Sequence, residues 1–210
     1  GPCTRSKIPK HRAGSYQIGN NGNHANDILC GDVYSLGVEY EGLSSTVDFA
    51  CQLTRFISST ATEDAPTSER IVRVLIDSII RYRGKPNEIR SDRGSNYISA
   101  AIRMLYKVFH IRINPGTAYH HQIVALVERW HQTLKQLIRV GRAANLDDNW
   151  PARLPLLELA YNATVNATTG YSPFFLEHIR HAVLPGDVTQ KALSDANNGK
   201  FADWVNKRIQ

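Results

Sequence analysis

The sequence predicts a single-domain α/β protein with a mixed five-stranded sheet flanked by helices. Three observations lead to this fold class. First, β-branched and aromatic residues gather between residues 28 and 60, which is typical of strands. Second, the rest of the chain alternates between short strand-like runs and segments with apolar residues at helical spacing. Third, 210 residues with 42% hydrophobic side chains suffice for one full core.

The first half of this domain is predicted to contain antiparallel strands and a helix. Residues 28–37 and 42–60 predict two or three strands, with the turn-like VEYE, residues 38–41, between them. A helix follows, for which Thr67 is the expected N-cap and Gly84 marks the end. The predicted apolar face of this helix comprises Ile71, Val72, Leu75, Ile79 and Tyr82.

The second half is predicted to be mostly helical. Strands at residues 88–92 and 111–116 flank an amphipathic helix at residues 96–110. A long helix runs from about Val124 to Val140, and another spans Trp150–Ala163. The predicted apolar side of the long helix comprises Leu126, Val127, Trp130, Leu134, Leu137 and Ile138.

The predicted domain spans residues 28–185, and the segments on either side of it are polar. Residues 1–27 predict a linker, and residues 186–210 predict a C-terminal linker helix. Three cysteines are too few and too sparse for a disulfide framework and indicate a reducing intracellular compartment. We therefore expect Cys30 and Cys51 to be reduced thiols in the core. No stretch approaches the roughly 20 apolar residues of a membrane span.

The positive charge of the chain is concentrated in one segment. The net charge is +6, and residues 103–142 contain seven lysines and arginines but a single acid, Glu128. A solvated basic surface would be the ordinary explanation. Concentrated basic charge around one isolated carboxylate instead indicates a polyanion that is brought to a reactive group.

Glu128 lies on the predicted long helix together with polar and basic side chains. Helical spacing predicts that His131, Gln132, Lys135 and Arg139 share its face, while the apolar residues point the other way. These side chains could be ordinary solvated helix residues. They could also form a surface that binds a phosphate backbone beside a carboxylate.

Two further acids favour the second interpretation. Asp32 lies in an apolar strand, and Asp92 ends a strand where a Gly-containing turn begins. Asp48, in another strand, is the main competitor of Asp32. Together, Asp32, Asp92 and Glu128 could hold a pair of hard cations such as Mg²⁺, which prefer oxygen ligands and catalyse chemistry at phosphodiesters.

The spacing and surroundings of these acids resemble those of the D-D-E integrase superfamily. Between Asp32 and Asp92 there are 59 residues, and between Asp92 and Glu128 there are 35. IRSDRGSNYIS resembles the family's S-D-x-G-x-x-F-x-S, and TAYHHQIVALVERWHQTLKQLIR resembles T-x-Y-H-P-Q-T-x-G-x-x-E-R-x-x-x-T-L-K. WPARLPLLELAYNATVNATTGYSPFFL resembles a block that is typical of gypsy-type LTR-retrotransposon integrases. The resemblance extends over about residues 28–185.

The resemblance implies an RNase H-like fold and an integrase catalytic core, a polynucleotidyl transferase and endonuclease. In such a core Asp32, Asp92 and Glu128 would ligate two Mg²⁺ or Mn²⁺ ions. The family trims the 3′ ends of element DNA and joins them to target DNA by transesterification. Lys135 matches the lysine that contacts element DNA, and Gln122 matches the glutamine of the active-site loop.

The resemblance also implies partners, a location and a neighbouring domain. The partners would be element ends and target DNA, together with a second copy of the core in a dimer, and no membrane. The protein would act on chromosomal DNA in the nucleus. CTRSK near the start resembles the tail of the zinc-binding domain that precedes such cores, and Cys3 would be its last zinc ligand.

The active-site loop departs from the family pattern. Where the family has H-P-Q-[ST]-[DNQ]-G, this chain has HHQIVA at residues 120–125, so the usual Pro and Gly are His121 and Ala125. The family's Asn three residues after the Glu is His131. These changes leave an alternative open: a domesticated, integrase-derived host protein, weakly active or inactive, that binds DNA or protein partners. A third alternative, another nuclease of the same fold class, is disfavoured by the gypsy-like block.

Overall fold

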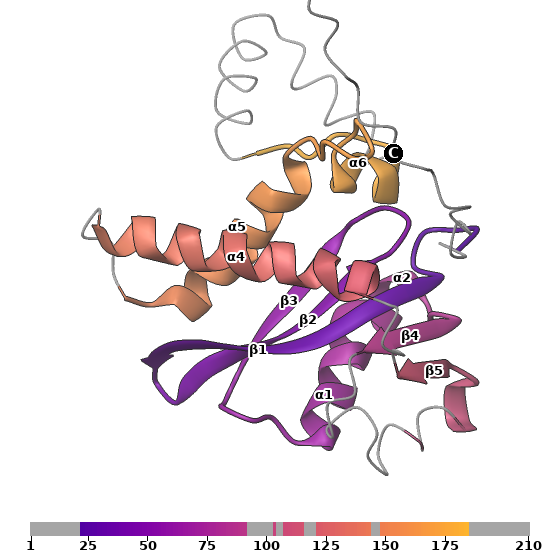
Figure 1. The fold of residues 1–210 in the computed structure, drawn as a ribbon, viewed down its shortest axis with the longest axis horizontal. Coiled ribbons are helices and arrows are strands. Elements are labelled where there is room, and N and C mark those ends of the chain that lie inside the picture. Colours follow the sequence, from indigo (N-terminus) through magenta and orange to yellow (C-terminus); the bar gives the residue numbers. More distant parts are fainter. Residues whose placement is uncertain (1–21, 92–102, 104–106, 116–120, 144–147, 185–210) are drawn as a thin grey trace, which may run out of the picture.

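The computed structural model describes residues 22–91, 103, 107–115, 121–143 and 148–184, with only the backbone at 113, 115 and 121–124. The described elements pack into a sheet with helices on both faces (Figure 1). No helix in this described part is long and apolar enough to cross a bilayer. In chain order the elements are β1 Ile28–Tyr40, β2 Leu43–Cys51, β3 Ile57–Thr62, α1 Ser68–Leu75, the π-helical segment η1 Ile76–Ile80, α2 Arg81–Arg83, β4 Glu88–Ser91, β5 Arg112–Pro115, α4 His121–Ala143, α5 Trp150–Ala163 and α6 Pro173–His178.

The sheet is mixed and five-stranded, as predicted. Its strand order is β3-β2-β1-β4-β5. The β1–β2 and β2–β3 pairs are antiparallel, whereas β1–β4 and β4–β5 are parallel. The predicted turn at residues 38–41 is corrected, because β1 continues to Tyr40 and pairs there with Leu43. Glu41 and Gly42 form the turn, with φ of 51° and 80°, which suits a tight two-residue hairpin.

Each face of the sheet carries its own hydrophobic core, because side chains alternate along the strands. Leu29 packs with Phe49 and Leu75 on the face that α1 covers. Cys30 packs with Trp130 and Trp150 on the face that α4 and α5 cover (Figure 1). Cys30 and Cys51 are buried free thiols, as expected, and burial raises the pKa of Cys30 to about 12.

The helix after β3 begins where it was predicted to begin. The Thr67 side chain accepts a hydrogen bond from the Arg70 N–H (3.3 Å), which confirms the N-cap, and Gly84 follows α2 with φ 78°. The predicted position of Tyr82 is wrong, since this residue is 71% exposed. The π-helical segment η1 explains the error, because its wider turn rotates all later side chains relative to an α-helical pattern.

Helix α4 begins at His121, about three residues before its predicted start. The family pattern has Pro and Gly in this stretch, both poor helix formers. In this chain His121 and Ala125 occupy those positions and allow a helix to form. The segment expected as an atypical active-site loop is therefore helical from His121 onward, while residues 116–120 lie outside the described part.

Helix α5 joins α4 on one face of the sheet, whereas Phe174 of α6 packs against the core of the α1 face. The predicted span of Trp150–Ala163 is confirmed for α5, and the Asn149 side chain caps its N-terminus by accepting from the Ala152 N–H (3.0 Å). Helix α6 was not predicted. Its signal is Ser172 followed by Pro173, a preferred N-cap followed by proline in the first turn.

A side chain of α5 hydrogen-bonds to the backbone of the edge strand β3. Asn162 is 1% exposed, and its side chain accepts from the Ile57 N–H (2.9 Å) and donates to the Ile57 carbonyl (2.8 Å). One amide thus satisfies both backbone groups that β3 would otherwise leave without partners at this position.

We expect Asn162→Ala to lower the free energy of unfolding by about 2–4 kcal/mol, because two buried backbone groups lose their partners. Urea denaturation followed by circular dichroism measures this loss. Thr168→Ala, at an exposed position of the following turn, is the matched control and should change stability by less than about 0.5 kcal/mol. Equal unfolding midpoints for Asn162→Ala and the wild type would contradict this role.

Candidate metal and DNA site

The Asp48 carboxylate lies at the centre of the α4-facing side of the sheet. It is 0% exposed and stands directly opposite Asp32 on β1. Its Oδ1 accepts hydrogen bonds from Trp130 Nε1 (3.0 Å) and from the Ser59 hydroxyl. Its Oδ2 accepts from the Thr46 hydroxyl (2.6 Å) and pairs with His131 Nε2 (2.9 Å). Four donors thus occupy the four lone-pair positions of one carboxylate.

This network distinguishes Asp48 from Asp32, the two candidates for the metal ligand on the strands β1 and β2. Asp48 is sealed from solvent, and its oxygens are fully used within the protein. The Asp32 side chain is 23% exposed, and its Oδ1 accepts from the Val33 N–H (2.8 Å). A metal ligand must reach a solvated ion, so Asp32 fits that role and Asp48 does not.

The structure describes two of the three predicted metal ligands, Asp32 and Glu128. For the third it describes only the strand that ends at Ser91, just before it. In the parallel β1–β4 pair Gly31 stands opposite Ser91, so the residues just before Asp32 and Asp92 are neighbours. Asp92 itself lies outside the described residues. Glu128 is exposed on α4. Within the described ranges, which omit Asp92, no group of three acids, histidines or cysteines is placed to hold a metal. The predicted ligands offer only carboxylate oxygens, which fit Mg²⁺ and Mn²⁺.

His131 lies in the interior, and its predicted place on the exposed DNA-binding face is corrected. The residue is 5% exposed, and its ring stacks on Tyr34 with centroids 4.2 Å apart. Its Nδ1 lies 3.9 Å from Asp32 Oδ2. Position 131 is three residues from Glu128, but it is also four residues after the buried Val127. It therefore lies at the edge of the buried face of α4, where its ring pairs with the buried Asp48 carboxylate.

The remaining polar residues of α4 do share an exposed face. Glu128, Gln132, Lys135 and Arg139 are all exposed, while Trp130, Leu134 and Ile138 are buried. Gln122 belongs to the first turn of α4, and its side chain lies outside the described part of the structure. DNA binding by these residues stays a prediction.

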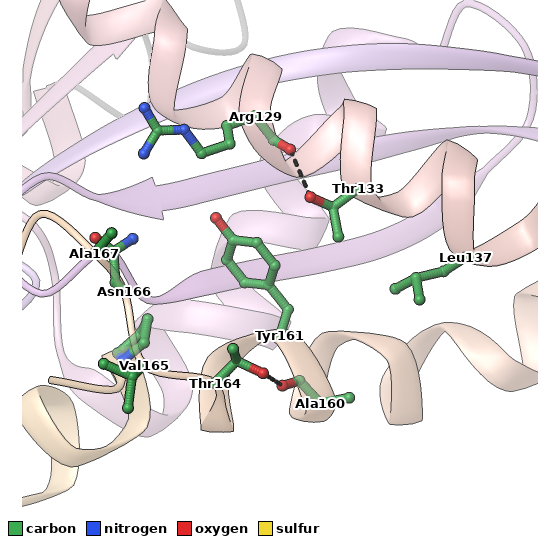
Figure 2. Close-up of a pocket in the computed structure, with 10 residues that line it drawn as sticks. Arg129, Thr133, Leu137, Ala160, Tyr161, Thr164, Val165, Asn166 and Ala167 are labelled. Carbon is green, nitrogen blue, oxygen red and sulfur yellow. Dashed lines mark hydrogen bonds between the residues drawn. The ribbon is translucent and has the colours of Figure 1, made fainter. Parts of the chain in front are cut away.

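A groove of about 390 Å³ lies on a different flank of α4. Figure 2 shows Arg129, Thr133 and Leu137 of α4 on one side and Tyr161 and Thr164, from α5 and its C-cap, on the other. Thr133 donates to the Arg129 carbonyl (3.0 Å) and so satisfies its own hydroxyl. No acid lines this groove, so it offers no oxygen cluster for a cation.

Sequence reasoning missed Glu158 on α5, which approaches the same network. Its Oε2 accepts from the backbone N–H of Ser59 (2.9 Å), the residue whose hydroxyl binds Asp48. Burial raises the pKa of Glu158 to about 7, and the Asp48 charge adds to the rise, while the Ser59 N–H and Arg83 oppose it. Only the pairing of β2 with β3 reveals this proximity.

The mixed sheet, its helical layers and a strand carboxylate facing a helix define a fold class. Two solved structures share the arrangement: the HTLV-2 integrase catalytic core domain in complex with magnesium, and the simian T-cell lymphotropic virus intasome in complex with PP2A regulatory subunit B56 gamma. For the first the TM-score is 0.60 at 20% identity, over 75% of this chain and 99% of that one. For the intasome the TM-score is 0.63 at 22% identity, over 78% of this chain and 58% of that one. The fold is therefore RNase H-like, as the resemblance implied.

Sequence comparison finds one family that is similar to this chain. The model of the integrase core domain matches residues 22–121. The chain is 27% identical over 163 residues to the retrovirus-related Pol polyprotein from transposon 412 of Drosophila melanogaster. The aligned region covers 77% of this chain but only 13% of that polyprotein. Residues 22–121 thus match the integrase core domain, and the chain is homologous to retrotransposon Pol polyproteins, of which it spans only a small part.

The raised pKa of Glu158 predicts a pH-dependent stability. The unfolded chain releases this proton near pH 4.5 and the folded protein near 7, so the wild type loses stability as pH rises between them. Glu158→Gln lacks this loss. We expect the stability of Glu158→Gln relative to wild type to rise by about 1–3 kcal/mol from pH 4.5 to pH 7.5, as measured by urea denaturation. Glu69→Gln, at an exposed position, is the control, and a difference that stays constant with pH for Glu158→Gln would refute the assignment.

Proposed function

We propose that this domain is an integrase catalytic core that processes the 3′ ends of element DNA and transfers them into target DNA. The observation that carries the proposal is the contrast between two facing aspartates. Asp48 is sealed and fully hydrogen-bonded, whereas Asp32, which the family spacing selects, stays partly open to solvent beneath α4. The homology to integrase cores supports the same assignment.

Asp32, Asp92 and Glu128 would hold the two divalent cations, Mg²⁺ or Mn²⁺. Bound there, such ions supply Lewis-acid activation for in-line transfer at a phosphodiester. Asp32 contributes a carboxylate from a rigid central strand, and Glu128 contributes one from a helix that is docked on that strand. Because α4 is fixed through Asp48, the separation between these two carboxylates is set by packing before any ion binds.

The exposed face of α4 would hold the DNA backbone beside these carboxylates. Lys135 and Arg139 lie two and three turns after Glu128 on the same face, with Gln132 between. Gln122, in the first turn of α4, would complete this surface. Positive charge along one helix face attracts phosphates and steers DNA without reading its sequence. The proposed DNA partners are element ends and chromosomal target DNA, and the proposed location is the nucleus.

A core dimer is part of the proposal. The HTLV-2 integrase core is described in dimeric and trimeric forms. We propose that this domain also self-associates and works as a homo-oligomer.

One observation favours the alternative of a domesticated protein with weak or no activity. Helix α4 begins at His121, where the family pattern has Pro and Gly in a flexible loop. A helix at that point would restrict the movement of Gln122 and could slow strand transfer. DNA and partner binding would then be the retained functions.

The three carboxylates are tested in a Mn²⁺-dependent disintegration assay on branched DNA. Asp32→Asn, Asp92→Asn and Glu128→Gln should each lower activity by at least about 100-fold, because each would remove a ligand of the catalytic ions. Circular dichroism should show folded variants, and Glu69→Gln, on the opposite face of the sheet, should keep full activity. Retained activity in any of the three would exclude that residue. An inactive wild type that still binds DNA would favour the domesticated alternative.

Lys135 is tested by DNA binding as a function of salt. Lys135→Ala should weaken binding to any sequence and reduce the slope of log K against log[salt] by about 1, since one phosphate contact is lost. Fluorescence anisotropy with labelled duplexes measures both quantities. Lys85→Ala, an exposed lysine before β4, is the matched control and should leave the slope unchanged. An unchanged slope for Lys135→Ala would remove this residue from the interface.

A further inference from the structure

The ring of His131 is held on three sides. Asp48 binds its Nε2 at 2.9 Å, and Tyr34 stacks on it at 4.2 Å with an interplanar angle of 7°. On the third side, Nδ1 faces Asp32 Oδ2 at 3.9 Å. Since the residue is 5% exposed, the surrounding packing leaves the ring little freedom to turn away.

The network around Asp48 assigns the ring hydrogen to Nε2. A carboxylate accepts hydrogen bonds, so Nε2 must carry a hydrogen in order to bind it. In the neutral ring, Nδ1 then presents its lone pair towards Asp32. A histidine that ligates a metal commonly has this arrangement, with one nitrogen donating to a carboxylate and the other facing the ion.

The distance between Nδ1 and Asp32 Oδ2 suits a shared cation. It exceeds hydrogen-bond length, so no direct hydrogen bond joins the two atoms. Two adjacent ligands of one octahedral ion, each about 2.1 Å from it, lie about 3.0 Å apart. The observed 3.9 Å is about 1 Å longer, so a small side-chain movement would bring both atoms to one ion.

We propose that His131 Nδ1 is a nitrogen ligand of the cation that Asp32 holds. This inference rests on the proposed function, because it needs a divalent ion at Asp32. An imidazole ligand makes an otherwise all-oxygen site favour Mn²⁺ over Mg²⁺, since nitrogen ligands suit transition metals better than hard cations. The site would therefore select its ion through a residue that the family pattern gives as Asn.

The direct test is pulsed electron paramagnetic resonance on tag-free protein loaded with Mn²⁺. A coordinated imidazole should give ¹⁴N modulation of the Mn²⁺ echo, which changes to a ¹⁵N pattern when the histidines are ¹⁵N-labelled. His131→Asn should abolish the nitrogen modulation and weaken Mn²⁺ binding about tenfold in calorimetry, with a smaller effect on Mg²⁺. His110→Asn, at the far end of the sheet, is the matched control and should keep both properties.

The outcomes separate this inference from the proposed function. Mn²⁺ that binds in an Asp32-dependent manner without nitrogen modulation would overturn the ligand role of His131 and leave the proposed function standing. Mn²⁺ binding that persists unchanged in Asp32→Asn would instead refute the metal site itself. If His131→Asn fails to fold, a His120→Asn/His121→Asn double variant decides. Retained modulation there supports His131, and lost modulation assigns the nitrogen to the 120–121 pair.

Discussion

The buried Asp48 carboxylate is the interaction on which the rest of the structure depends. An ionised group with no exposure is tolerated only when its oxygens are fully satisfied, and removal of a single partner typically costs several kcal/mol. Two of its four partners, Trp130 and His131, come from α4. The sheet and the helix that supply the predicted metal ligands are therefore coupled through one residue that itself cannot bind metal.

This coupling explains why the two faces of the sheet differ. The α1 face is filled by aliphatic and aromatic side chains and serves stability. The α4 face combines an apolar core around Trp130 and Trp150 with a polar row across three strands, in which Asp32, Asp48 and Ser59 stand side by side. Asp48 and Ser59 lie under the helices, and Asp32 lies where the row reaches solvent. The row thus runs from a sealed structural carboxylate, Asp48, to the carboxylate that is proposed to bind metal, Asp32.

Features that depend on local sequence pattern, such as helix caps and bounds, could be predicted from the sequence. Contacts that depend on strand register and on the docking of helices could not. The Thr67 cap, the bounds of α5 and the buried apolar residues of α4 follow from cap preferences and helical spacing. Tyr82 was misplaced because a π-helical turn leaves no clear pattern in the sequence. The pairing of Asp48 with His131 joins residues 83 positions apart and becomes visible only when β2 is placed beneath α4. The early start of α4 was hidden by the family pattern, whose Pro and Gly are absent here.

The length of the exposed face of α4 also limits how much DNA this face could contact in the proposed complex. From Glu128 to Arg139 the helix advances by about 16 Å at 1.5 Å per residue. One strand of duplex DNA advances by about 3.4 Å per nucleotide, so this face spans about five phosphates, or half a helical turn. If this face binds DNA as proposed, one copy of the domain would cover only a short stretch of backbone, and a longer footprint would need further protein surface.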